Sequence, residues 1–498
     1  MVIRMDYAFQ ILQWLAVVFV FCVGLGVLWV FLLFIADICQ SRNAIRRNFP
    51  VIGRFRYVFT KLGEFFRQYF FAMDREELPF NRAERNWVNR ASEGGDATSP
   101  FGSTRDIRPT GSVLFVNCPF PTLHQDAVPI GPVTIGPHCD TPYTTSSIFN
   151  ISGMSYGAIS RPAVLALSHG ARKAGIWLNT GEGGVSPYHL EGGADIVFQI
   201  GTAKYGVRDV EGQLNDTRLR ETAARESVRM FELKLSQGAK PGKGGILPGA
   251  KVTEEIARIR GIPAGHDSVS PNRHPDINNI EQLVDVYCRV REVTRKPVGL
   301  KAVIGAYGWL DTLFAQIAKR PVEDAPDFIT VDSADGGTGA APMSLMDYMG
   351  LPLRESLPLV ADLLHKHGLR QRIKLIASGK LVTPAEVAWA LCAGADFAVS
   401  ARGFMFSLGC IQALQCNRNT CPTGITTHNT RLQRGLDPGS KSERVRQYAE
   451  TMHRELGVIA HSCGVTEPRR LRRFHCRMVT ETGRSVPLNE LYPDDQAA

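Results

Sequence analysis

The feature that most constrains the fold is a pattern that repeats from Ser147 onward. In each repeat an apolar, β-branched run ends in a glycine-rich turn, and many runs precede a segment whose apolar residues have helical spacing. Alternating strands and helices predict a parallel sheet, and eight repeats predict an α/β fold of the closed (β/α)8 TIM barrel type. The eight runs are SIFNISGMSYG, IWLNTGEGG, DIVFQIGTAKYG, MFELKLSQGAKPG, PVGLKAVIG, DFITVDSADGGTG, IKLIASGKL and FAVSARGF.

Three regions flank the predicted barrel, which we place at residues 147–437. Residues 1–40 are predicted to form a membrane anchor, and residues 41–146 an amphipathic and linker region leading into the barrel. Within it, the Gly-, Pro-, Ser- and Thr-rich residues 78–147 are predicted to be loops and short strands. Residues 438–498 are predicted to be helices packed on the barrel, without an assigned function.

Bulk composition narrows the class of protein. The 498 residues contain 44% hydrophobic residues and 47 glycines, which fits a globular α/β enzyme. The net charge is +9, but no nucleic-acid-reading motif accompanies it, so nucleic acid is not an expected partner. Eleven cysteines in a chain of this length indicate free thiols and one metal site in a reducing compartment, not a disulfide framework.

The segment from Tyr7 to Ala36 contains no Asp, Glu, Lys or Arg. About 20 apolar residues span a bilayer as a helix, and a signal peptide has a shorter apolar core, so we predict one uncleaved transmembrane helix. Basic residues dominate the flank that follows, which predicts a single-pass protein of the inner (cytoplasmic) membrane with its catalytic domain in the cytoplasm. Those residues are Arg42, Arg46, Arg47, Arg54, Arg56 and Lys61.

The stretch FPVIGRFRYVFTKLGEFFRQYFF follows this basic flank and mixes aromatic residues with Arg and Lys at near-helical spacing. Such a helix fits two locations equally well. It could lie along the inner membrane surface, or it could pack on the catalytic domain.

The last two repeats end in a glycine beside a cation, at Gly379-Lys380 and at Arg402-Gly403. Backbone N–H groups at such turns, followed by a helix, bind anions, and a phosphate held by units seven and eight recurs in this fold. We therefore predict a phosphate site at these two turns.

Charged residues at other strand ends extend this predicted site. Lys301 lies in the apolar run VGLKAVIG, where a buried ammonium needs a negative partner. The turn VDSADGGTG offers polar side chains and glycines that permit close backbone approach, and the glycine-flanked tips NTGEGG and QGAKPGKGG carry one charged candidate each. The candidates in these three turns are Asp332, Ser333, Gly336, Gly337, Glu182 and Lys240.

Three cysteines, Cys410, Cys416 and Cys421, form a C-x5-C-x4-C pattern after the eighth strand. A tetrahedral zinc site would need a fourth ligand, for which His428 is a candidate, although zinc-site cysteines usually lie two to four residues apart. The Cys421-Pro422 step is familiar from iron–sulfur loops, and three thiolates match a [3Fe–4S] cluster. Spacing alone leaves both interpretations open.

Six ordered motifs occur over residues 147 to 430: GMSYGAIS, NTGEGG, KLSQGAKPG, DGGTGAAP, SGKLVTPAEVAWALCAGAD and LGCIQALQCNRNTCPTG. Together they resemble the FMN-binding synthase domain of glutamate synthase, and most closely the stand-alone branch of that family. The resemblance implies an FMN-containing barrel with a [3Fe–4S] cluster on the three cysteines. It further implies an oxidoreductase acting on CH-NH2 donors, in which reduced FMN passes a hydride to the imine of 2-oxoglutarate and ammonia.

The resemblance also implies roles for individual residues. Glu182 and Lys240 would contact the substrate or imine, and Arg260 would pair with a substrate carboxylate. Ser155 would contact flavin and substrate, and Lys301 would neutralise the pyrimidine edge of the flavin. Phosphate contacts would come from the turns Gly379-Lys380 and Arg402-Gly403.

Two departures from the family pattern bear on the substrate. The motif that reads KPGEGGQLPG in full-length enzymes is KPGKGGILPG here, with Lys243 for a glutamate and Ile246 for a glutamine. An isoleucine cannot supply the hydrogen bonds of that glutamine, so an enzyme acting on another amino acid or keto acid remains an alternative, as does an electron-relay subunit.

The supply of ammonia and electrons also departs from full-length enzymes. We expect no glutaminase domain, so ammonia would come free or from a partner. Because no G-x-G-x-x-G fingerprint follows a strand, we expect the electron donor to be a protein or a membrane carrier.

Overall fold

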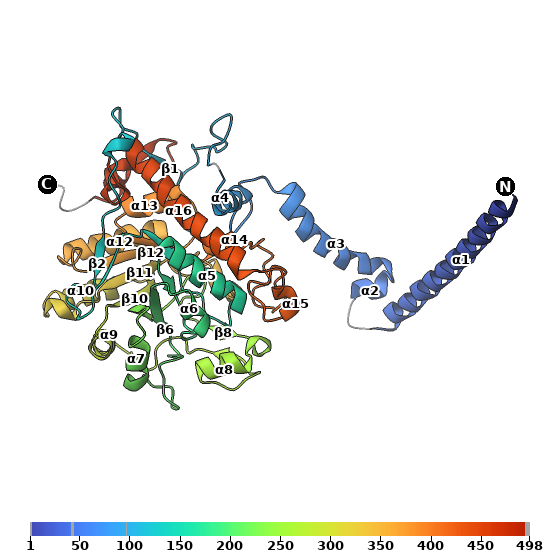
Figure 1. Ribbon diagram of the computed structural model, residues 1–498, viewed down its shortest axis with the longest axis horizontal. Helices are drawn as coiled ribbons and strands as arrows, with labels where there is room; N and C mark the ends of the chain where they lie inside the picture. Colours follow the sequence, from blue (N-terminus) through green and yellow to red (C-terminus); the bar gives the residue numbers. More distant parts are fainter. Residues whose placement is uncertain (1, 41–43, 96, 494–498) are drawn as a thin grey trace. The chain divides into compact units, whose positions relative to one another are not determined.

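The computed structural model describes residues 2–40, 44–95 and 97–493. The chain divides into two compact units, 1–83 and 84–498 (Figure 1). Arg42, one of the basic residues counted for membrane orientation, lies outside the described residues. The boundaries predicted at residues 40, 146 and 437 remain predictions.

The first unit is helical. Helix α1 (Val2–Cys39) contains a 31-residue stretch, Phe9–Cys39, with a mean hydropathy of 2.9. It is the one helix among the described residues whose length and composition suit a membrane crossing. It is followed by α2 (Ala44–Asn48), α3 (Ile52–Phe66) and a π-helical turn at Arg67–Phe71.

Eight parallel strands of the second unit close into a barrel, which confirms the predicted fold class (Figure 1). The last strand pairs with the first, Ala398 opposite Phe149, so the sheet has no edge. The strands are β4 (Phe149–Ile151), β5 (Leu178–Asn179), β6 (Ile196–Ile200), β7 (Val228–Lys234), β10 (Val298–Val303), β11 (Phe328–Asp332), β12 (Lys374–Ser378) and β13 (Phe397–Ser400).

Helices follow most of these strands. Local sequence sets their ends: the Ser160 side chain accepts a hydrogen bond from the Ala163 amide at the start of α5, and Gly175 ends it in the left-handed conformation. The helices of the barrel are α5 (Arg161–Ala174), α6 (Pro187–Glu191), α7 (Asp216–Ala223), α9 (Ile280–Thr294), α10 (Gly308–Ile317), α11 (Met343–Met346), α12 (Leu353–Lys366), α13 (Pro384–Cys392) and α14 (Arg402–Ser407).

The amino-terminal end of the barrel is closed by a hairpin of β2 (Val133–Ile135) and β3 (Tyr143–Thr145). Ile135 and Tyr143 from this hairpin join Trp177, Phe328 and Phe397, near the starts of barrel strands, in one buried apolar cluster. Charged groups at this end are paired with one another, as Asp327 is with Arg291 and Arg372, whereas active sites of this fold lie at the opposite, carboxyl end of the strands.

A long excursion at the carboxyl end follows β7. It contains a short hairpin of β8 (Ile246–Leu247) and β9 (Ser268–Val269), with helix α8 (Glu254–Arg260) between them. This excursion carries several of the predicted site residues.

The segment after residue 437 is only partly as predicted. Helix α16 (Pro438–Ser462) packs along α5 and α17 (Leu488–Leu491) is short, while the short helix α15 (Thr430–Gln433) lies just before this segment. However, β14 (Cys476–Val479) and β15 (Ser485–Pro487) form an antiparallel sheet with β1 (Val113–Phe115). Strand β14 pairs directly with β1, more than 300 residues earlier in the sequence, a partner that no local pattern shows.

Helix α4 (Arg82–Ser92) lies in a region that was predicted to be loops and short strands, so that part of the prediction was wrong. Val88 and Ala91 are buried, and the ring of Trp87 meets that of Tyr448 edge-on. Tertiary packing of this apolar side stabilises the helix inside a stretch rich in helix-breaking residues.

Candidate active site

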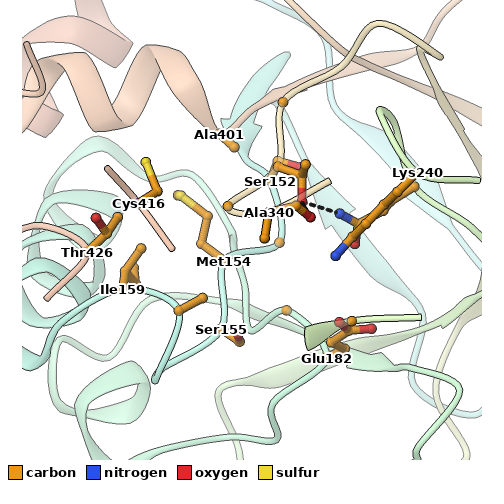
Figure 2. A pocket seen from close by; sticks show the side chains of 18 of the residues that line it. Ser152, Met154, Ser155, Ile159, Glu182, Lys240, Ala340, Ala401, Cys416 and Thr426 are labelled. Carbon is orange, nitrogen blue, oxygen red and sulfur yellow. Dashed lines mark hydrogen bonds between the residues drawn. The ribbon is translucent and has the colours of Figure 1, made fainter. Parts of the chain in front are cut away.

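A large open cavity lies at the carboxyl ends of the barrel strands. Figure 2 shows Glu182 and Lys240 on one side of it and Cys416 and Thr426 on the other. Most of the predicted site residues line this one cavity, although they are spread over more than 200 positions of the sequence. They are Ser155, Glu182, Lys240, Arg260, Lys301, Asp332, Gly337, Gly379, Lys380, Arg402 and Cys416.

Three predicted cofactor contacts lie behind the cavity wall. Ser333 donates to the Asp335 carboxylate and accepts a hydrogen bond from the Leu353 amide at 2.9 Å. The amide of Gly336 donates to the Ser333 carbonyl at 2.9 Å, and that of Gly403 to the Ser400 hydroxyl at 3.1 Å. These three residues make hydrogen bonds within the turns, whereas neighbouring residues of the same turns line the cavity.

Glu182 is held by cations. Its Oε2 lies 2.8 Å from Nζ of Lys234, the last residue of β7. Burial alone would raise the pKa of the Glu182 carboxyl, but the nearby Lys234, Lys240 and Arg260 hold that pKa below its ordinary value. The carboxylate is therefore ionised at neutral pH, with 17% of its side chain exposed to the cavity.

Lys240 follows the tight turn at Gly238 and Ala239. Burial lowers its pKa to about 8, and the like charge of Lys234 adds to this while Glu182 opposes it. An ammonium group with this pKa holds a proton at neutral pH and releases it readily, which is the property of a general acid.

Arg260, the last residue of α8, reaches back into the cavity wall. Its Nη1 donates to Ser268 Oγ at 3.1 Å, its Nη2 to Ser155 Oγ at 3.4 Å, and its guanidinium lies over the Tyr205 ring at 5.2 Å. Burial lowers its pKa, which starts from so high a value that the guanidinium remains a cation. It can bind a carboxylate bidentately.

The position of α8 is fixed by a carboxylate shared between two tyrosines. Glu255 accepts hydrogen bonds from Tyr156 Oη at 2.6 Å and Tyr188 Oη at 2.7 Å. Tyr156 follows β4, so this contact ties the helix that carries Arg260 to the first strand of the barrel.

Lys301 points into the barrel mouth from β10. Its Nζ lies 3.5 Å from Asp332 Oδ2 on the neighbouring strand β11. Burial would lower the pKa of Lys301, but the carboxylates of Asp332 and Glu232 raise it above its ordinary value. Asp332 is therefore the negative partner that the sequence predicts for this buried lysine.

The two predicted phosphate turns lie side by side, because β12 and β13 are paired strands. Gly379 has φ +120°, and a Cβ there would overlap Ser333, so only glycine fits. Lys380 Nζ lies 2.8 Å from Asp335 Oδ2. Arg402 Nη2 donates to the Thr338 carbonyl at 2.6 Å, and its Nη1 lies 3.8 Å from Cys416 Sγ.

The cysteine loop follows α14 directly. Burial would raise the pKa of Cys421, but hydrogen bonds from Thr423 and Thr426 lower it below its ordinary value, which favours a thiolate. Burial raises the pKa of the Cys410 thiol, with smaller contributions from Cys416 and Cys421.

The zinc alternative required a fourth ligand, and His428 is engaged elsewhere. Its Nε2 lies 2.8 Å from the Gly157 carbonyl, and its ring packs edge-on against Tyr156. Over residues 2–40, 44–95 and 97–493, no three or more His, Cys, Asp or Glu side chains converge as ligands of a single metal ion.

Sequence reasoning missed three charged residues of the site. Lys234 stands in the apolar run MFELKL, the same signal that identified Lys301, and was overlooked in favour of the glycine-flanked Lys240. Glu232 is buried and accepts from Gln199 at 2.6 Å and from Thr330 Oγ1 at 2.6 Å. Lys251 is also buried, and its Nζ donates to the carbonyls of Ala158 at 2.7 Å and Cys416 at 3.3 Å.

The sequence matches the conserved region of glutamate synthase over residues 124–466. The chain belongs to the glutamate synthase family. Two relatives of this glutamate synthase family protein differ in how much of the chain they match. The glutamate synthase large subunit-like protein YerD of Bacillus subtilis (strain 168) is 38% identical over 92% of this chain and 94% of its own. The archaeal glutamate synthase [NADPH] of Methanocaldococcus jannaschii is 36% identical over 68% of this chain.

This glutamate synthase family protein spans 62% of the length of the Methanocaldococcus relative, so part of that protein has no counterpart in the match. Among solved structures, a mandelate oxidase mutant with a monooxide FMN adduct matches with a TM-score of 0.43 and 16% identity over 80% of this chain and 92% of that one. A double mutant of flavocytochrome b2 with pyruvate matches with a TM-score of 0.47 and 14% identity over 87% of both chains. Through its family, the protein is an oxidoreductase enzyme.

Proposed function

We propose that the protein is a membrane-anchored FMN and iron–sulfur oxidoreductase that reduces the imine of 2-oxoglutarate and ammonia to glutamate. The observation that carries this proposal is the buried set of one carboxylate and three cations at the barrel mouth. Glu182, Lys234, Lys240 and Arg260 suit a small molecule with two carboxylates and a nitrogen at its reacting carbon.

The residues at the barrel mouth fit FMN. A Cβ at Gly337 would lie 2.7 Å from Arg402 Nε, so glycine here lets the Arg402 side chain pack on this turn, and both residues line the cavity. The backbone at Gly379-Lys380 and the Arg402 turn would hold the phosphate, and Lys301 would face the electron-rich edge of the ring system. Bound there, reduced FMN would supply a hydride.

The cysteine loop fits an iron–sulfur cluster with three protein ligands. Cys421 has hydrogen bonds that favour its thiolate, and Cys416 lines the same cavity as the phosphate turns. Three thiolates in one loop suit a [3Fe–4S] cluster, which would carry single electrons to the flavin.

The remaining chemistry is assigned to side chains of this chain. Reduction of a neutral imine needs a hydride at carbon and a proton at nitrogen. Lys240, with a pKa of about 8, holds that proton, and Arg260 binds a carboxylate and orients the carbon. Glu182 orients the nitrogen and stabilises its positive form.

Helix α1 would anchor the enzyme in the inner membrane with the barrel in the cytoplasm. Its 31-residue apolar stretch supports this, together with the basic residues that follow it. A donor protein or a membrane carrier would supply electrons.

A second candidate is an oxidoreductase of the same cofactors that acts on another amino acid or keto acid. Ile246 lines the cavity from β8, so an apolar side chain occupies part of the substrate wall. Lys240 and Arg260 line the same cavity, so a substrate with a carboxylate still suits this site.

The test is to purify the full chain anaerobically, record its absorption and low-temperature EPR spectra, and assay glutamate formation with a chemical reductant. We expect flavin and cluster signals and turnover of 2-oxoglutarate with ammonium. A colourless protein would refute both candidates. Flavin and cluster signals without glutamate formation would refute the first and favour the second.

A further inference from the structure

The end of helix α1 is joined to α3 by an ionic elbow around Asp37. The Asp37 side chain is fully buried, although it lies at the end of an otherwise exposed apolar helix. Its Oδ1 lies 2.7 Å from Nη2 of Arg46 and 2.7 Å from Nη2 of Arg54, and its Oδ2 accepts from the Val51 amide at 3.1 Å. One carboxylate thus holds both segments that follow α1.

Close packing at Gly53 also brings α2 and α3 together. A Cβ at Gly53 would lie 2.9 Å from the Ile45 carbonyl oxygen, so the start of α3 packs directly on α2. Helix α3 therefore begins next to the end of α1 and does not continue it. Whatever surrounds the end of α1 also surrounds the first turns of α3.

Helix α3 carries an apolar stripe along one side. The stripe follows the spacing i, i+3, i+7 and i+10, which keeps side chains on one helix face. All four side chains are exposed, from 42% at Leu62 to 73% at Ile52. The stripe consists of Ile52, Phe55, Phe59 and Leu62.

The side of α3 away from the stripe is more polar. Arg56, Thr60 and Lys61 are exposed there together with Tyr57, and Arg47 is exposed on α2. No Asp or Glu occurs between residues 38 and 63, and Glu64 is the one acidic residue of α3, so basic residues outnumber acidic ones in this segment. A basic amphipathic helix with aromatic residues in its apolar stripe is the composition of helices that lie in the plane of a membrane surface.

We propose that α3 is a second membrane contact, lying flat in the headgroup region of an anionic phospholipid bilayer with its stripe turned to the acyl chains. The inference rests on the proposed membrane anchor α1. Two observations select the bilayer as occupant. The elbow places α3 at the exit of the span, and the basic side matches the negative charge of the cytoplasmic leaflet. The sequence alone left packing on the catalytic domain equally open.

Photocrosslinking in the full chain tests the proposal. Benzoylphenylalanine is introduced at Phe59 in the stripe, at Thr60 on the polar side, or at Phe21 inside α1, and the protein is placed in nanodiscs of phosphatidylcholine and phosphatidylglycerol. After irradiation, mass spectrometry counts lipid and peptide adducts. We expect Phe21 and Phe59 to yield lipid adducts, with Phe59 at least about tenfold above Thr60. Benzoylphenylalanine at Phe55 repeats the test should the Phe59 variant fail to accumulate.

Two results would overturn the inference. Lipid adducts at Phe21 with peptide adducts to residues 84–493 at Phe59 would place α3 on the catalytic domain and leave the anchor intact. Absence of lipid adducts at both positions would refute the anchor together with the second contact.

Discussion

Lys234 Nζ lies 2.8 Å from Glu182 Oε2, joining the last residue of β7 to the turn after β5. The same ammonium group donates to Gln237, whose Nε2 donates to Thr338 Oγ1 at 2.9 Å. One lysine therefore connects three of the turns that surround the cavity. Because both charges are buried, removal of either one leaves the other without its main partner.

Replacement of Lys234 by Gln should lower kcat/KM about 10- to 100-fold. The pKa of Glu182 is held down chiefly by Lys234 against the effect of burial, so the variant should raise that pKa. If Glu182 acts as a carboxylate, the acid limb of the pH–rate profile then moves to higher pH. Lys173→Gln, which removes an exposed ion pair, is the control. An unshifted acid limb would contradict the role given to this pair.

Lys240 should determine the alkaline limb of the profile. Its pKa is about 8, and the proposed donor is the protonated form, so activity should fall as the pH rises through about 8. Lys240→Met should lower kcat about 100- to 10,000-fold. Lys240→Arg keeps a charge that does not titrate in this range, so its remaining activity should lack the alkaline limb. Persistence of that limb in the Arg variant would exclude Lys240 as its origin.

Ile246→Gln should restore a hydrogen-bonding side chain to the substrate wall. If 2-oxoglutarate binds beside this residue, its KM should fall by up to about tenfold, since a hydrogen bond to a charged group contributes roughly 1.5 kcal/mol. Val269→Gln, at the paired position of the same hairpin and exposed, is the matched control. Equal KM values for both variants would show that position 246 does not contact the substrate.

Cys416→Ser should abolish the EPR signal expected from the cluster while leaving bound flavin in the absorption spectrum. The Cys463→Ser variant removes a buried thiol at the end of α16, outside the cysteine loop, and should keep the signal. A signal that survives in Cys416→Ser would show that the ligand assignment is wrong.

Asp37→Asn should loosen the elbow that precedes α3. Arg46 and Arg54 lose their shared carboxylate, and opening of this segment should speed tryptic cleavage after these residues by about fivefold in nanodiscs. Asp74→Asn removes a more exposed partner, 3.4 Å from Arg82, and should leave the cleavage pattern unchanged. Equal rates for both variants would mean that Asp37 does not hold the elbow.

The barrel could be predicted because its signals are local. Each strand is a short apolar run ending in glycine. A lysine inside such a run, as at Lys301, predicts a buried charge. The same signal at Lys234 was present but lay six residues before a more conspicuous glycine-flanked lysine. Lys234 was therefore missed because another candidate lysine lies close to it in the sequence, although its own pattern was the same as that of Lys301.

Other parts of the site depend on contacts between distant segments. Glu232 is satisfied by Asn179, Gln199 and Thr330 from three other strands, which only barrel closure brings together. Likewise β14 pairs with β1 across most of the chain. Pairing between distant segments leaves no periodic pattern within either segment, so it cannot be predicted from one segment alone.

The cysteine loop is fastened to the protein by its own hydrogen bonds. Lys251 binds the carbonyls of Ala158 and Cys416, and Asn419 accepts from the His428 amide at 2.7 Å and donates to the Ala250 carbonyl at 3.3 Å. These bonds tie the loop to the turn after β4 and to the excursion after β7. Part of the chain entropy of this loop is therefore offset by protein contacts, and a substitution at Lys251 or Asn419 would reach the cysteines through the backbone.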